Sequence, residues 1–290
     1  MADELPDILT ALQLAQGRRL LPNRLSTAEL RRLDAGIRRG SVFSARTTSG
    51  IYVSKIKEVV DGIAGGTMDL ATARLALKQT LDALGYTPEG GFLDDFPGTV
   101  PPAVAGTLQD LRSDRRLNFM LRTQEALMAG ASQKLRGMEE QAIRMFPAWE
   151  LVRIEERNAP RDWPARINIA LANLDRPALA AGAKLIFTKG DPVWTAIGSS
   201  DLFDDALDVD HPPFAFESGK GWRAVPAEEV DALGITGPAG EPVKDITDAL
   251  PRPKASVAGI APDILAKLKA ELDAEEAELG VLTMKGRVKP

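Results

Sequence analysis

The chain has 290 residues, 44% of them apolar, which is enough to bury the core of one large domain or two modest ones. It has no cysteine, which excludes a disulfide framework and a thiolate metal site, and its single histidine, His211, excludes a histidine-rich ligand set. This composition argues against a zinc enzyme and against a histidine-dependent catalytic triad. The net charge of −5 gives no overall reason to expect nucleic-acid binding. The longest apolar stretches, such as residues 178–187, are too short for a membrane span, and the N-terminus lacks a signal-peptide pattern. We therefore expect a soluble protein made in a cytoplasm.

The charges are distributed unevenly along the chain. Eight arginines lie within residues 18–46, and five aspartates lie within residues 201–210. This asymmetry is compatible with head-to-tail contacts between copies or with a basic surface that faces DNA, although solvated helix faces are the commoner explanation.

Residues 1–25 are expected to form an N-terminal arm or short helix, because leucines recur at helical spacing until Pro22 interrupts the pattern. The segment Ser26-Thr27-Ala28-Glu29 is a capping box, in which the serine hydroxyl and the glutamate carboxylate satisfy backbone amides reciprocally. It predicts a helix from about Thr27 to Arg39, which begins a helical domain over residues 26–90.

The rest of residues 26–90 predicts a helical hairpin. Apolar residues at mostly three- and four-residue intervals indicate a first helix over residues 48–63, which Gly65-Gly66 ends. Asp69 is suited to cap a second helix, which has an apolar stripe from Leu70 to Leu84, and Gly85 is placed for the left-handed turn that follows.

Prolines and glycines between residues 88 and 102 indicate a linker over 91–102 and a domain boundary. The next part, residues 103–235, is expected to combine helix with a small mixed α/β region. Residues 103–145 favour one long helix or two consecutive helices with a break near Ser113. Alternating residues predict strands over 149–154 and 183–188.

Three further elements are expected after the first of these strands. Residues 160–164 open a short helix that runs through Leu171, residues 189–224 are rich in loops, and Pro226 begins a brief helix that ends before Gly234. The fold class is therefore mainly α with a small α+β second domain, in which short strands and loops follow a helical N-terminal region.

The C-terminal part is expected to consist of a linker over residues 236–261 and a helix with a tail over residues 262–290. The helix is predicted from Pro262 to Leu279, where Ala, Glu, Lys and Leu dominate. Its apolar stripe is thin, so we expect it to dock on another surface. The N-terminal arm and this helix are the candidate segments for contacts with partners.

All four tryptophans lie between Trp149 and Trp222, although aromatic residues make up only 5% of the chain. We expect them to form the core and anchor surface of the second domain. Base stacking on single-stranded nucleic acid is the alternative, since Arg153, Arg161, Arg166 and Arg223 lie nearby. Pairing of these arginines with Glu150, Glu155 and Asp162 is the favoured interpretation.

No catalytic, metal-binding or cofactor-binding residue is predicted. Glu150, Glu155, Glu156 and Asp162 are close in sequence, but nothing in their spacing places two carboxylates across a pocket. The glycine-rich segments match neither a P-loop nor a dinucleotide fingerprint. His211 precedes two prolines and is expected to be a solvated or hydrogen-bonded turn residue.

Several blocks together carry a resemblance to a known family. Residues 38–86 have an aromatic residue before a small-residue turn, Phe43-Ser44-Ala45, and then two helices around Gly65-Gly66. The segment Asp114-Arg115-Arg116 precedes a helix that contains Arg122-Thr123 and then Gly130. These blocks resemble the N-terminal helical segment and the next block of the phage Mu F-like head-morphogenesis proteins. The resemblance extends in scattered blocks over residues 26–234.

Three later motifs are similar to prophage structural proteins of the same lineage. They are Phe146-Pro147-Ala148-Trp149-Glu150-Leu151-Val152-Arg153, Pro160-Arg161-Asp162-Trp163 with Arg166, and His211-Pro212-Pro213-Phe214-Ala215-Phe216 with Trp222 and Arg223. The candidate interface or structural residues are therefore Phe43, Arg116, Arg122, Thr123, Trp149, Glu150, Arg153, Arg161, Asp162, Trp163, Arg166, Phe214, Phe216, Trp222 and Arg223.

The resemblance implies a low-copy structural protein of a tailed-bacteriophage head, which associates with the portal vertex, helps head assembly and in some members touches DNA or leaves with it on ejection. Its expected partners are the portal and major capsid proteins, with DNA as a non-specific contact and no membrane. We expect it in the virion, oligomeric, without cofactors and without enzymatic activity.

This sequence departs from the pattern because it lacks the cysteines and the mid-domain histidine of many members, which argues against a metal or thiol function. The alternatives are a head–tail connector or head-completion ring at the neck, and a toxin-like enzyme domain.

Overall fold

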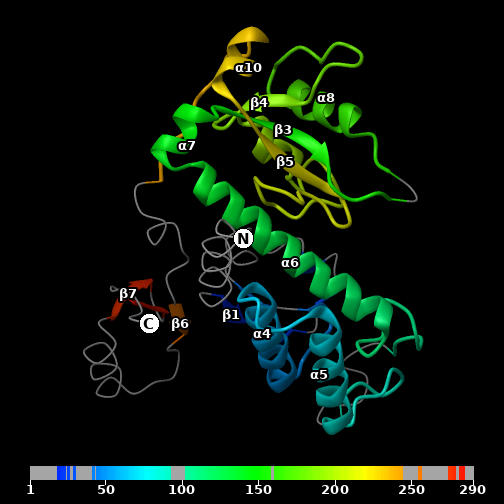
Figure 1. The fold of residues 1–290 in the computed structure, drawn as a ribbon. Helices are drawn as coiled ribbons and strands as arrows, with labels where there is room; N and C mark the ends of the chain where they lie inside the picture. Colours follow the sequence, from blue (N-terminus) through cyan, green and yellow to red (C-terminus); the bar gives the residue numbers. More distant parts are fainter. Residues whose placement is uncertain are drawn as a thin grey trace.

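The computed structural model describes residues 18–23, 25–26, 29–30, 41–42, 44–92, 102–157 and 160–243, and it places three short strands further along the chain. The described part contains seven helices and a three-stranded antiparallel sheet, so the fold is mainly α with a small α+β portion, as the sequence predicts. In Figure 1, the long helix α6 (Asp114–Gly137) runs diagonally through the molecule, with α4 and α5 on one side and the sheet on the other. Over the described residues, no helix combines the length and the apolar character needed to cross a membrane.

The predicted helical hairpin is confirmed as α4 (Gly50–Ala64) and α5 (Leu70–Ala83). Asp69 accepts hydrogen bonds from the amides of Ala71 and Thr72, which satisfies two donors that the first turn of α5 would otherwise leave free. Gly66 and Gly85 adopt positive φ angles of 68° and 63°, a conformation that other residues adopt at a cost. The turn predicted after α4 and the end predicted for α5 are therefore observed at these glycines.

The segment before α4 is only partly as expected. The capping box is confirmed, because the Ser26 amide donates to the Glu29 carboxylate at 2.8 Å and the Glu29 amide donates to the Ser26 hydroxyl at 3.3 Å. The expected N-terminal helix is wrong at its end, since Arg19–Leu20 form strand β1, which pairs in parallel with β2 (Ser41–Val42). Backbone pairing with a distant strand overrides the local leucine spacing there. Residues 1–17 and 31–40 lie outside the described residues.

Helix α6 begins where a break was predicted, because the Ser113 hydroxyl accepts the Arg116 amide at 3.1 Å. Residues 103–112 form turns and not a helix, since the Asp110 carboxylate accepts the amides of Gly106 and Arg112. The first half of α6 packs on α4 and α5. Phe92, which belongs to the predicted linker, packs in the same core, and its ring centroid lies 5.3 Å from that of Tyr86. The helical core therefore extends across the predicted boundary.

A small antiparallel sheet follows the short helix α7 (Glu140–Met145), with β3 (Ala148–Arg153) in the centre between β4 (Ile186–Thr188) and β5 (Lys220–Val225). The strands predicted over 149–154 and 183–188 are confirmed as β3 and β4, the second being shorter than expected. Strand β5 corrects the expectation of loops and turns up to residue 224. It is specified by pairing with β3, about seventy residues earlier, and such non-local pairing leaves little local signal.

The sheet is covered on both faces. The tryptophan-rich core lies on one face together with α8 (Trp163–Asn173) and α9 (Val193–Ile197), whereas α10 (Ala227–Ala232) packs Val230 against the other. Helices α8 and α10 confirm the two short helices predicted around residues 160–171 and 226–233. Helix α9 was not predicted, because its five residues lie within a stretch rich in turn residues.

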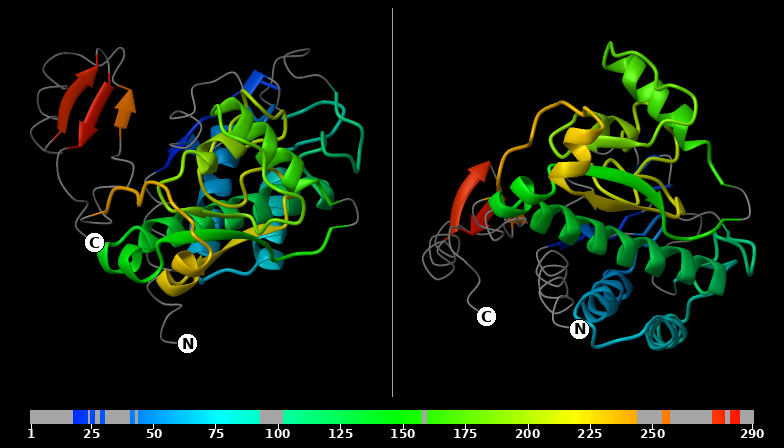
Figure 2. Two further views of the ribbon diagram at one scale, coloured as in Figure 1. Left: turned by 90° about the horizontal axis from the view of Figure 1, so that it is seen from above. Right: turned by 45° about the horizontal axis from the view of Figure 1, so that its top comes forward.

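The C-terminal expectation is partly wrong. Residues 274–278, expected to be helical, form β7 (Ala274–Glu278), which pairs with β8 (Val281–Met284) beside β6 (Lys254–Ser256). Pairing with the apolar strand 281–284 outweighs a helical preference that has little apolar stripe to support it. Figure 2 shows this small sheet to one side of the main body. Residues 257–273 lie outside the described part.

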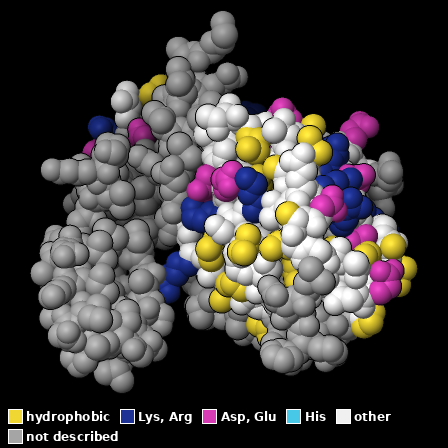
Figure 3. Space-filling model, turned by 90° about the horizontal axis from the view of Figure 1, so that it is seen from below, with side chains coloured by type: hydrophobic (Ala, Val, Ile, Leu, Met, Phe, Trp, Pro, Cys, Tyr) yellow, Lys and Arg dark blue, Asp and Glu magenta, His cyan; other side chains and the backbone are white. Residues whose placement is uncertain are grey.

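The helical layer also contributes an exposed face. Seen from below in Figure 3, hydrophobic side chains are interspersed with basic and acidic groups. Ile51 on α4 and Leu75 on α5 are 66% and 57% exposed. Single exposed apolar residues are ordinary on protein surfaces, so this face alone does not indicate a site.

Candidate functional site

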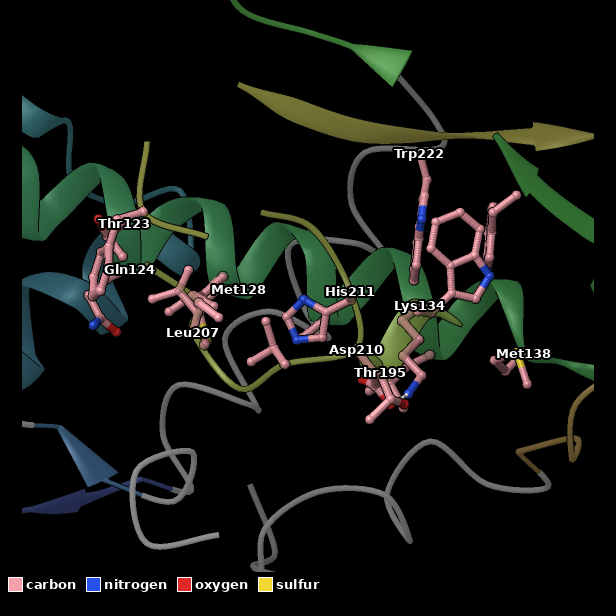
Figure 4. A pocket seen from close by; sticks show the side chains of 18 of the residues that line it. Thr123, Gln124, Met128, Lys134, Met138, Thr195, Leu207, Asp210, His211 and Trp222 are labelled. Atoms are coloured by element: carbon pink, nitrogen blue, oxygen red, sulfur yellow. Dashed lines mark hydrogen bonds and ion pairs between the residues drawn. The ribbon is translucent and has the colours of Figure 1, made fainter. Parts of the chain in front are cut away.

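The main candidate site is an open cleft along α6, with a cavity volume of about 1120 Å³. One wall is a single face of the helix, from Arg116 to Met138, which is about 33 Å long at 1.5 Å per residue. The opposite wall consists of segments 189–195 and 206–211. Arg18, Leu30, Ser44 and Ala45 contribute at one end, and segment 238–243 contributes at the other. Figure 4 shows Gln124, Met128 and Lys134 along the helix, opposite His211 and Asp210 from the facing loop.

Apolar side chains form the middle of the cleft. Met120, Met128 and Met138 lie on the cleft face of α6 with Leu127 and Leu135 between them, because residues three, four or seven positions apart share one side of a helix. Phe119 stacks on Phe216 with ring centroids 5.3 Å apart. Methionine is flexible and polarisable, so such a surface adapts to apolar ligands of different shapes.

Two arginines lie at the N-terminal end of the cleft. Arg116 donates to the Ser44 hydroxyl at 2.6 Å and to the backbone oxygens of Ala45 and Leu108. Arg18 is 7% exposed and donates to the Gln124 amide oxygen, whereas its Nε has no hydrogen-bond partner. Desolvation by burial lowers the pKa of Arg18 to about 10 and also lowers the pKa of Arg116.

A salt bridge lies near the other end. Lys134 of α6 pairs with Asp210, beside His211, whose Nδ1 lies 2.7 Å from the carbonyl oxygen of Pro212. Burial alone would raise the pKa of Asp210, but the Lys134 ammonium outweighs it, and the net pKa is below the ordinary value. His211 is 9% exposed, so the predicted turn histidine is hydrogen-bonded and largely buried.

Lys189 joins the sheet to the end of α6. Its Nζ donates to the backbone oxygens of Gly137, at 2.5 Å, and Ala142, at 3.0 Å, and lies 4.4 Å from the ring centroid of Trp149. Burial lowers the pKa of Lys189 to about 8. Because two carbonyls and an aromatic face hold this ammonium, its arrangement is that of a structural clamp at a helix C-terminus.

The tryptophans form the expected core. Trp149 and Trp222 stack in parallel with ring centroids 4.9 Å apart, and Trp194 meets Trp222 edge-on at 5.3 Å. The four tryptophans are between 1% and 6% exposed. Trp149, Trp194 and Trp222 also line the cleft, but because these rings pack on one another, little of any ring is left free for stacking on a base.

Arginines of this region pair with carboxylates, as predicted, but most of the pairs are not the predicted ones. Arg223 pairs with Glu150 at 2.6 Å, as expected, and also with Glu229. Arg161 and Arg166 pair with Asp205 and not with Asp162.

The other predicted pairs differ for local reasons. Asp162 accepts the Ala165 amide at 3.0 Å and caps α8, so its carboxylate is already used. Arg157 pairs with Glu155 at 2.6 Å, whereas Arg153 is exposed at the end of β3.

The candidate residues from the sequence fall into separate places. The cleft brings together Arg116, Thr123, Trp149, Phe216 and Trp222. Trp163 and Phe214 are buried in the core, and Arg122 is exposed on α6 away from the cleft. Phe43 lies outside the described residues.

Sequence reasoning missed Arg18, Lys134, Lys189 and Asp210. The helical spacing of residues on α6 carried a partial signal, because it places Arg116, Thr123, Met128 and Met138 on one side. The partners across the cleft come from segments far apart in sequence and left no such signal.

The carboxylates that line the cleft, among the described residues, are Asp191, Asp210 and Glu241. Within the described ranges, no group of three or more His, Asp or Glu side chains could hold a metal ion. Lys134, Asp210 and Lys189 are engaged by ion pairs or hydrogen bonds within the chain, an arrangement that suits binding. Comparisons with protein-family models, curated proteins and solved structures give no match to this chain.

Proposed function

We propose that this chain is a structural minor protein of a tailed-bacteriophage head, which associates with the portal vertex, acts in head morphogenesis and carries out no catalysis. The sequence supports this through scattered blocks within residues 26–234 that resemble the phage Mu F-like head-morphogenesis proteins. Its partners would be the portal and major capsid proteins, and its place would be the virion.

The observation that carries the proposal is the open cleft along α6. It is about 33 Å long and apolar in the middle, and its Lys134, Asp210 and Lys189 side chains are already held by neighbouring atoms of the same chain. A long adaptable surface of this kind suits a segment of another protein better than a small polar substrate. Assembly proteins act through such contacts.

The test is to find the chain in purified virions and procapsids made by the genome that encodes it. Quantitative mass spectrometry against the major capsid protein should give a low copy number, and the tagged chain should retain the portal protein in a pull-down. Deletion of the gene for this chain should leave heads that are unfilled or misassembled.

Two results would contradict the proposal. Absence of the chain from both virions and procapsids would remove the structural role. A symmetric ring of about a dozen copies in solution would instead favour a connector at the neck, because closed cyclic assemblies are built from repeated identical interfaces.

A further inference from the structure

The arginine end of the cleft is short of negative charge. The hydrogen bonds that Arg18 and Arg116 donate go to neutral oxygens, and none of the described carboxylates lies within ion-pair distance of either guanidinium. Asp61 contributes a longer-range attraction to Arg18, but its carboxylate pairs with Lys57 at 2.6 Å. A buried cation without a paired anion is unfavourable, so an incoming carboxylate would relieve the desolvation of both arginines.

One end of the cleft therefore differs electrostatically from the other. At the Lys134 end the positive charge is neutralised by Asp210, whereas at the arginine end it is not. An elongated occupant that has its negative charge at one end would bind in one direction only, with that end at Arg18 and Arg116.

The shape of the cleft indicates the form of the occupant. Dividing the cavity of about 1120 Å³ by the length of about 33 Å gives a mean section of about 34 Å². This is less than half the section of an α-helix, which is about 10 Å across with its side chains, so one face of a helix would enter the cleft while its opposite face stays outside. The wall is a helix face whose apolar side chains recur at three and four residues. A second helix matches such ridges, and methionine side chains adapt to it.

We propose that the cleft binds one amphipathic helix of a partner protein, with acidic residues at the end of that helix that lies against Arg18 and Arg116. This deepens the proposed function and rests on it for the inference that the partner is a protein of the head. The helix would lie along α6, with its apolar side chains against Phe119, Leu127 and Leu135, which line the cleft and are partly exposed.

The test uses the full chain and two labelled peptides of about 20 residues, which as helices span about 30 Å. Both have Leu at i, i+3, i+4 and i+7 among Ala and Gln. One has glutamates at its N-terminal end and the other has lysines there. Fluorescence anisotropy should show that the glutamate peptide binds about tenfold more tightly than the lysine peptide, which corresponds to about one charge-assisted hydrogen bond.

Gln124→Glu is the decisive variant. It keeps the shape of Gln124 while placing a carboxylate on Arg18, so it should weaken binding of the glutamate peptide about tenfold without lowering thermal stability. The matched control is Gln79→Glu, which makes the same change at an exposed position of α5. Arg18→Gln should remove the preference for glutamate over lysine, whereas Arg122→Gln, exposed on α6 outside the cleft, should leave it unchanged.

Three outcomes would overturn the inference. The first is that the chain binds both peptides equally or binds neither. The second is that Gln124→Glu and Gln79→Glu change the affinity for the glutamate peptide equally. The third is that phosphatidylglycerol vesicles displace the labelled peptide whereas unlabelled peptide does not, which would indicate a lipid site. Peptide binding by a chain that is absent from virions would retain the cleft and reject the proposed function. A chain that is found in virions but binds neither peptide would retain the proposed function and reject the helix-binding cleft.

Discussion

Gly130 lies at the closest approach of α6 to the loop that carries His211. A Cβ atom built at this position would lie closer than 3.0 Å to the carbonyl oxygen of Pro212, and 2.9 Å from His211 Nδ1. Real Cβ atoms essentially never come that close. Replacing Gly130 by alanine therefore forces the helix and the loop apart, and the obstacle is backbone, which cannot rotate away as a side chain does.

The sign of the stability change distinguishes this contact from ordinary helix propensity. In an unobstructed helix, glycine to alanine stabilises by about 1 kcal/mol. Overpacking a close contact costs about 1–3 kcal/mol, and more where backbone must move. We expect Gly130→Ala to destabilise the protein by about 2 kcal/mol in total, which lowers the melting temperature by about 4–8 °C for a chain of this size.

Thermal unfolding followed by near-ultraviolet circular dichroism measures this change. The loop that contacts Gly130 continues into Phe214, which packs in the same core as the stacked tryptophans that give the signal. Gly50→Ala is the matched control, because its Cβ would meet only the Pro22 side chain, at an ordinary 3.8 Å. It should be neutral or slightly stabilising. If Gly130→Ala were as stable as the unsubstituted protein, the loop would not lie on α6 and the cleft geometry would be refuted.

Three other changes test the ion pairs and the buried lysine. Asp205→Asn should cost about 2 kcal/mol in denaturant unfolding, because it leaves Arg166, 7% exposed, without its carboxylate; a loss under about 0.5 kcal/mol would contradict this. Lys189 has its pKa lowered from 10.5 to about 8 by burial, so the unfolded chain binds more protons between these values. The stability of the unsubstituted protein relative to Lys189→Met should therefore rise as pH increases from 8 to 10.5, and a constant difference would show that the ammonium is not desolvated. Arg223 lowers the pKa of Glu229 from 4.5 to about 2, so stability present above pH 4.5 should be lost as pH falls toward 2. Glu229→Gln should remove that loss and high salt should weaken it, and an acid transition unchanged by the substitution would argue against the pair.

Helix ends were predictable because they are local. The Ser26 capping box, the Asp69 cap and the turn at Gly66 depend on residues two to four positions apart, and each is observed where the sequence placed it. The burial of the tryptophans was predictable from their concentration in a chain with few aromatic residues.

The sheet and the ion pairs were predictable only in part. Strand β3 alternates clearly, whereas β5 contains Gly221 between Lys220 and Trp222 and is a strand because β3 pairs with it. Arginine–carboxylate pairing followed from composition, but the loop around residues 199–217 decides that Arg166 meets Asp205. Phe92 shows the same limit, since a residue from the predicted linker packs in the helical core.

The sequence by itself therefore determined the helical hairpin, the helix caps, the aromatic core and the absence of thiol and multiple-histidine chemistry, because these depend on composition or on neighbours along the chain. Only the tertiary structure decided the cleft. Its walls come from Arg18, Leu30, Ser44 and Ala45 and from segments 116–138, 189–195, 206–211 and 238–243, which are brought together when β5 pairs with β3 and α6 packs between the helices and the sheet. The arginines at one end and the ion pair at the other face the same groove for that reason alone.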